Sequence, residues 1–181
     1  MKPLMAGLLA GAALVLSGCY TSEKLLMDPA QAATPLAVGR QTTSGGEDKP
    51  ETVQISLGAD HWYVIHEDSD AKDKDQRVLF TPLAGAAPGE QRYVFTSSEN
   101  ASFLYGVATR RQGRIYFDLP SCDQPAAQAA AAAHGVTAPP GKALSPVCTF
   151  KDAASLTGAL KDYADHTDPK RSLSSLPAAA S

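Results

Sequence analysis

The sequence has few of the residues that usually mark a reactive centre. It contains three cysteines among 181 residues, and no two of them form a C-x-x-C pair of the kind found in zinc and redox sites. G-x-S-x-G, Walker and dinucleotide-binding glycine patterns are also missing, which removes the commonest motif-based hydrolase and nucleotide-binding interpretations. We therefore expect neither a metal ion nor a cofactor.

Positive charge is scarce as well. The chain has 16 Lys and Arg against 19 Asp and Glu, a formal net charge of −3. Nucleic acids and anionic membrane surfaces attract proteins with clustered basic residues. The excess of acidic residues argues against binding to nucleic acids or to anionic membrane surfaces through charge. We expect no nucleic acid partner.

The longest apolar run, residues 4–16, is too short to cross a membrane. It has 13 residues, whereas a spanning helix needs about 20. Lys2 precedes the run, and Leu16-Ser17-Gly18-Cys19 ends it. This arrangement of a positive start, an apolar segment and a closing cysteine resembles the leader and lipobox of bacterial lipoproteins.

The resemblance implies a lipid anchor on Cys19. In that family the cysteine receives a diacylglycerol, the leader is removed before it, and its new amino group is usually acylated. Residues 1–18 would then be a signal peptide, and two or more acyl chains would hold the protein stably on a bilayer. Position 20 is tyrosine rather than the aspartate associated with inner-membrane retention. We expect outer-membrane placement facing the periplasm, with the inner membrane as the alternative.

Two further cysteines, Cys122 and Cys148, remain for the mature chain. An oxidising compartment favours a disulfide between them. As metal ligands they would need closely spaced partners, and only His134 lies between them. As nucleophiles they would need an activating environment that the sequence does not display. The disulfide is the preferred interpretation.

The middle of the chain has the alternation of a β-rich fold. Val53, Ile55 and Leu57 alternate with polar residues, and similar runs of β-branched and aromatic residues follow, separated by turns. Long crossovers are missing, so the pairing should be antiparallel. The pattern predicts a mainly β (α+β) fold, a small antiparallel meander forming a barrel or a sandwich of seven or eight strands. The expected strands cover residues 36–42, 53–57, 61–66, 77–81, 92–96, 103–108 and 115–119, with an eighth at 147–150.

Two helices are expected after the strands. The Ala-rich run 126–134 has high helix propensity, and an apolar stripe that includes Leu156 and Leu160 marks a second helix that should lie on the sheet. Four regions result: a signal peptide (1–18), a lipidated tether (19–35), a single β-rich domain with C-terminal helices (36–166) and a disordered tail (167–181).

Three enzyme-like or metal-like patterns are better explained as surface features. Ser69 and Lys72 match S-x-x-K, but they lie in a solvated acidic run without the companion motifs of penicillin-binding proteins. That acidic run, residues 67–75, lacks the glycine and glutamate of a calcium-binding EF-hand loop. His61 and His66 are five residues apart on an expected strand, so they point to opposite faces and cannot readily share a metal ion.

Function is indicated only broadly. Trp62 and Tyr63 are candidate ligand contacts, although aromatic residues in such a run more often belong to a core. We expect a lipid-anchored, non-enzymatic binding or structural module that contacts the membrane through its anchor. Its partner would be an envelope protein or a small ligand. The alternative is a periplasmic hydrolase that acts on cell-wall material.

Overall fold

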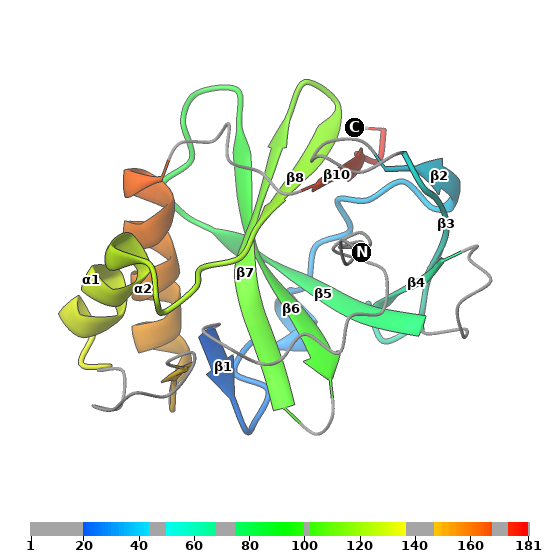
Figure 1. The fold of residues 1–181 in the computed structure, drawn as a ribbon. Helices are drawn as coiled ribbons and strands as arrows, with labels where there is room; N and C mark the ends of the chain where they lie inside the picture. Colours follow the sequence, from blue (N-terminus) through cyan, green and yellow to red (C-terminus); the bar gives the residue numbers. More distant parts are fainter. Residues whose placement is uncertain are drawn as a thin grey trace, which may run out of the picture.

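A computed structural model describes residues 20–43, 50–67, 75–99, 102–136, 147–167 and 174–180. Within these ranges the chain forms ten strands and two α-helices that follow most of the strands (Figure 1). Neither helix has the length and apolar character that crossing a membrane requires. The elements are β1 (Tyr20–Ser22), the 3-10 helix η1 (Pro29–Gln31), β2 (Gly39–Thr42), β3 (Thr52–Leu57), β4 (Tyr63–Glu67), β5 (Asp75–Leu83), β6 (Gln91–Glu99), β7 (Ser102–Arg111), β8 (Arg114–Asp118), α1 (Pro125–Ala133), β9 (Cys148–Thr149), α2 (Ala153–His166) and β10 (Ser174–Pro177).

The strands β2 to β8 form an antiparallel meander in which each strand pairs with the next. β10 pairs antiparallel with the outer edge of β8. The two ends of the sheet then meet, because Leu36, before β2, forms a bridge with Ala178, after β10. The amide of Ala37 donates to the carbonyl of Pro177 at 3.1 Å. The expected mainly β fold with C-terminal helices is confirmed, and the sheet closes on itself as in a small barrel.

A tight turn connects β7 to β8. Gln112 and Gly113 both have positive φ, 50° and 74°, which is the conformation of a two-residue type I′ hairpin turn. Glycine reaches this region without strain, so Gln112-Gly113 is a local signal for the hairpin. Such turns explain why consecutive strands pair in antiparallel fashion.

The inside of the closed sheet is filled by alternate residues of its strands. Ile55 on β3 lies opposite Ile65 on β4, and both are buried. The ring of Phe80 lies 5.7 Å from that of Tyr63 and 6.1 Å from that of Phe117. Side chains repeat every second residue along a strand, so the observed alternation places one face of each strand in this core. The residues of this inner core are Leu36, Val53, Ile55, Tyr63, Ile65, Val78, Phe80, Tyr93, Phe95, Ala108, Ile115, Phe117 and Leu176.

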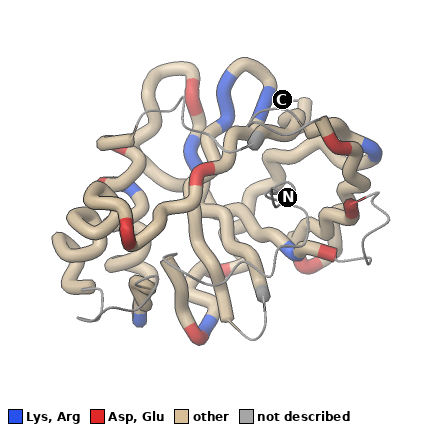
Figure 2. The backbone as a smooth tube through the Cα atoms, in the orientation of Figure 1, with Lys and Arg blue, Asp and Glu red and all other residues tan. Residues whose placement is uncertain are grey.

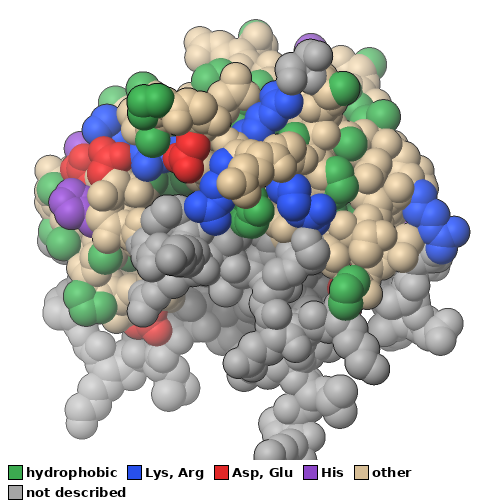
Figure 3. All heavy atoms as spheres, turned by 90° about the horizontal axis from the view of Figure 1, so that it is seen from above, with side chains coloured by type: hydrophobic (Ala, Val, Ile, Leu, Met, Phe, Trp, Pro, Cys, Tyr) green, Lys and Arg blue, Asp and Glu red, His purple; other side chains and the backbone are tan. Residues whose placement is uncertain are grey.

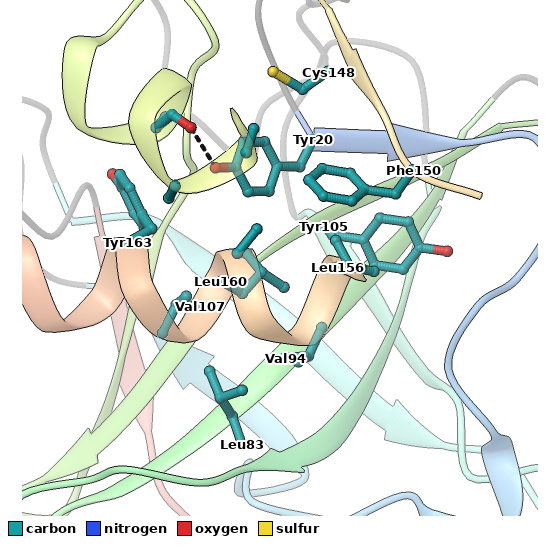
Figure 4. Close-up of a cluster of buried hydrophobic side chains, with 14 of the residues drawn as sticks. Tyr20, Leu83, Val94, Tyr105, Val107, Cys148, Phe150, Leu156, Leu160 and Tyr163 are labelled. Carbon is teal, nitrogen blue, oxygen red and sulfur yellow. Dashed lines mark hydrogen bonds between the residues drawn. The ribbon is translucent and has the colours of Figure 1, made fainter. Parts of the chain in front are cut away.

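A second core lies on the outer surface of β5, β6 and β7. The two helices, β1 and β9 cover this surface, and Figure 4 shows α2 crossing between the sheet and the ring of Tyr20. Leu156 and Leu160 of α2 have no exposed surface. The apolar stripe expected on this helix is therefore its buried face. The helix begins after Asp152, whose carboxylate accepts from the amide of Ser155 at 2.8 Å.

The structure differs from the tether expected at residues 19–35. Tyr20–Ser22 form β1, which is buried throughout and lies between β7 and β9. The hydroxyl of Tyr20 donates to the carbonyl of Ala127 at 2.6 Å. A strand of three residues shows no periodicity in the sequence, and this one is formed by pairing with a strand more than 80 residues away.

The structure also differs from the tail expected at residues 167–181. Ser174–Pro177 form β10, and Leu176 has no exposed surface because it points into the inner core. A short run rich in serine and proline resembles a disordered segment by composition. Here its single large apolar residue is enough to dock it against β8, where Leu176 lies opposite Ile115.

Candidate functional site

A small pocket lies on the outer surface of the sheet, between strands β6 to β8 and the C-terminal end of α2. Its volume is about 190 Å³. Two neighbouring turns near the pocket carry charge: Figure 2 shows basic residues around the β7–β8 hairpin and an acidic residue in the adjacent turn between β5 and β6. The described residues lining the pocket are Glu90, Arg92, Val107, Thr109, Arg111, Tyr116, Asp118, Ala164, Asp165 and Thr167.

One wall of the pocket is an ionic cluster centred on Asp165. Arg92 donates to one carboxylate oxygen of Asp165 at 2.5 Å, and Lys161 donates to the other at 2.9 Å. These hydrogen bonds, first that of Lys161 and then that of Arg92, hold the pKa of Asp165 below its usual range. Arg92 also donates to the carbonyl of Gly85 at 3.1 Å. The cluster therefore fastens the end of α2 to the turn between β5 and β6.

The opposite wall comes from the β7–β8 hairpin. The guanidinium carbon of Arg111 lies 4.2 Å from the ring centroid of Tyr116, a cation–π arrangement. Asp118 accepts from the hydroxyl of Tyr163 at 3.1 Å, which joins β8 to α2. Figure 3, which looks down on this end of the molecule, shows basic side chains spread across the face and a group of acidic and histidine side chains at its left side.

The pocket is large enough to hold only a small group. Its volume is below the roughly 300 to 1,000 Å³ of sites for drug-sized ligands, so it suits a group of a few atoms or the end of a chain. The described lining contains no histidine or cysteine. Among its hydroxyls, that of Thr167 donates to the carbonyl of Tyr163 at 2.9 Å. This hydroxyl is therefore bonded to the backbone of α2 rather than to a carboxylate of the lining.

The cysteine pair expected from the sequence lies together. Cys122 and Cys148 form a disulfide with their Cα atoms 5.9 Å apart, and both are fully buried. The bond links the turn before α1 to β9, and β9 pairs with β1. It therefore belongs to the second core rather than to the pocket.

Trp62 and Tyr63, the candidate ligand contacts, point into different cores. Trp62 is 8% exposed, and the guanidinium of Arg77 lies 5.1 Å from its ring centroid. Tyr63 is fully buried, and its hydroxyl donates to the carbonyl of Leu36 at 3.2 Å. Neither residue is among those that line the pocket.

The other residues singled out by the sequence are not gathered into one site. His61 lies in a turn with φ of 65°, and His66 Nδ1 lies 2.9 Å from an oxygen of Asp75. Across the described ranges, no group of three His, Cys, Asp or Glu side chains could hold a metal ion. Cys19, the S-x-x-K match at Ser69 and Lys72, and most of the acidic run fall outside the described residues.

Sequence reasoning missed the pocket residues because they come from four separate segments. Alternation along β6 and β7 could have placed Arg92 and Thr109 on the outer face, but it could not bring α2 beside them. That juxtaposition depends on the packing of α2 across the sheet, which brings Asp165 to Arg92. Comparison with family models, with curated proteins and with solved structures found no match for the chain.

Proposed function

We propose that this chain is a lipid-anchored cell-envelope protein, facing the periplasm from the outer membrane, and that it acts as a non-enzymatic binding or structural module. The observation that carries the proposal is the position of the lipobox-like motif. It ends at Cys19, and the next residue, Tyr20, belongs to β1 of the disulfide-bonded domain. A disulfide supports an extracytoplasmic location, because such bonds persist in oxidising compartments.

The pocket supports the binding role. It presents Arg92, Arg111 and the ring of Tyr116 beside the carboxylates of Asp118 and Asp165. Groups of both signs on one small surface suit a polar ligand, or a polar side chain of another envelope protein, better than an apolar molecule.

The alternative, a hydrolase acting on cell-wall material, has less support. Acid–base hydrolysis with two carboxyl groups needs one of them protonated near neutral pH. Lys161 and Arg92 lower the pKa of Asp165, so its carboxylate stays ionised.

The anchor is tested by metabolic labelling with a fatty acid. The wild-type protein should carry label and fractionate with the outer membrane, whereas Cys19→Ser should lose both. Cys122→Ser is the matched control, since it removes a cysteine and should keep the label. Equal label in the wild type and in Cys19→Ser would contradict the proposal.

The binding role is tested by crosslinking in intact envelopes followed by mass spectrometry. Arg111→Ala should weaken a crosslinked product that forms through the pocket, because it removes a cation from the lining. Arg40→Ala, on β2, is the control and should leave the product unchanged. Unchanged products in both variants would show that the pocket is not the contact surface.

A further inference from the structure

The start of β1 leaves no spacer between the domain and the expected anchor. Tyr20 has no exposed surface and is paired with Tyr105 and Cys148. Consecutive Cα atoms are about 3.8 Å apart, so an acyl-bearing Cys19 could not be far from this buried strand. This inference rests on the lipid anchor proposed above. It adds that the anchor must hold one particular side of the domain near the bilayer.

The helix α1 lies on that side. The hydroxyl of Tyr20 donates to the carbonyl of Ala127, and Figure 4 shows β1 and α1 side by side at this contact. The disulfide holds the segment just before α1 to β9, which pairs with β1. α1 is therefore fixed next to the point where the chain leads to Cys19.

The exposed surface of α1 carries no charge. The helix has the sequence PAAQAAAAA, and its buried residues are Ala127, Ala130 and Ala131. After Pro125, which is exposed at the start of the helix, the exposed positions Gln128, Ala129, Ala132 and Ala133 follow one another at helical spacing and form a single face. We call these four residues the α1 outer face.

An uncharged face suits close contact with a bilayer. The chain as a whole is negative, at −3, so its acidic surfaces are repelled by anionic lipid headgroups. Alanine and glutamine add no such repulsion, and small side chains give little drive to insert into the hydrocarbon. We propose that the α1 outer face lies on the lipid surface beside the acyl anchor, with the closed sheet directed away from it. Figure 1 shows α1 and β2 at opposite sides of the molecule.

Site-specific photocrosslinking to lipid tests this orientation. The full-length lipidated protein is reconstituted in phosphatidylcholine–phosphatidylglycerol vesicles that contain an alkyne-tagged phospholipid. One variant carries Ala129→p-benzoylphenylalanine on the α1 outer face. Its matched control carries Val38→p-benzoylphenylalanine, a position 57% exposed beside β2. Both positions accept a large side chain at the surface, and thermal melts check that each variant is folded.

The expected result is several-fold more tagged lipid on the variant at position 129 than on that at position 38. A ten-residue Gly-Ser insert between Cys19 and Tyr20 should bring the two yields close together, because the anchor then no longer fixes the orientation. Equal yields without the insert, in protein whose acylation is verified by mass spectrometry, would overturn the orientation while leaving the anchor intact. Protein isolated from the envelope that carries no acyl chains on Cys19 would instead contradict the proposed function.

Discussion

The Cα atom of Tyr20 is paired with that of Cys148, so the first described residue lies directly beside the disulfide. Cys148 in turn is joined to Cys122, at the turn before α1. Three segments that are distant in the sequence thus meet within one buried layer. The second core depends on this meeting, because the Ala-rich α1 offers only small side chains to hold it in place.

Loss of the disulfide should lower the free energy of unfolding substantially. The cysteines are 26 residues apart, and closing a loop of this length stabilises the fold by roughly 3 to 4 kcal/mol in the chain-entropy model. Denaturant titration of Cys122→Ala/Cys148→Ala should show this loss, and reduction of the wild type should reproduce it. Mass spectrometry of the nonreduced, trypsin-digested protein should find the two cysteine peptides linked. Free thiols at both positions in protein isolated from envelopes would contradict the prediction.

The strand β1 should contribute measurably to stability through Tyr20. Tyr20→Phe removes the hydroxyl that donates to the carbonyl of Ala127 and should cost about 1 to 2 kcal/mol. Tyr20→Ala also removes the ring that packs 4.8 Å from that of Phe150 and should cost about 3 to 5 kcal/mol. Tyr116→Phe, at the pocket, is the control and should change the free energy of unfolding by less than about 0.5 kcal/mol. An unchanged free energy of unfolding in Tyr20→Ala would show that β1 is not docked.

Glu67 should make stability depend on pH. Burial, followed by the nearby charge of Glu51, raises its pKa from 4.5 to about 7, and one carboxyl oxygen is buried without a hydrogen-bond partner. The folded protein therefore holds this proton more tightly than the unfolded chain does. Protonation stabilises the fold, and stability should fall as pH rises from 4.5 to about 7.

The variant Glu67→Gln isolates this effect. Its side chain is neutral at every pH. The unfolding free energy of this variant, measured from pH 4 to 8, should therefore not show the fall that Glu67 causes in the wild type. At pH 8 the variant should be more stable than the wild type by about 1 to 2 kcal/mol, since residual solvent contact weakens the full effect. Glu23→Gln, in an exposed loop, is the control. Parallel pH profiles for the wild type and Glu67→Gln would refute the prediction.

Gly106 should not tolerate alanine. A Cβ atom there would overlap the ring of Phe95 and lie 2.6 Å from the carbonyl oxygen of Asp118, which belongs to the paired strand. Overpacking of this kind costs about 1 to 3 kcal/mol or more, because backbone and a buried ring must both move. Gly58→Ala is the matched comparison. Its closest contact, at 2.5 Å, is the side-chain oxygen of Asp60, which can rotate away. Thermal melts that rank the two variants equally would contradict this account.

Local patterns were sufficient for most of the strands. Val53 and Ile55 alternate with polar neighbours, and Gln112-Gly113 sets a turn without help from distant residues. The stripe containing Leu156 and Leu160 likewise marked the buried face of α2 before its partner surface was known. These features repeat at two or 3.6 residues, so a short window of sequence contains the information that determines them.

Only tertiary structure decided what the short segments do. Tyr20 pairs with Tyr105, and Leu176 docks opposite Ile115. Neither β1 nor β10 is long enough to show a period, so their strand conformation comes from hydrogen bonds and burial supplied by distant parts of the chain. The pocket has the same origin, since Arg92 meets Asp165 only after α2 packs across the sheet. Sequence determines such contacts through the whole fold, because their free energy depends on chain segments that are neighbours only in space.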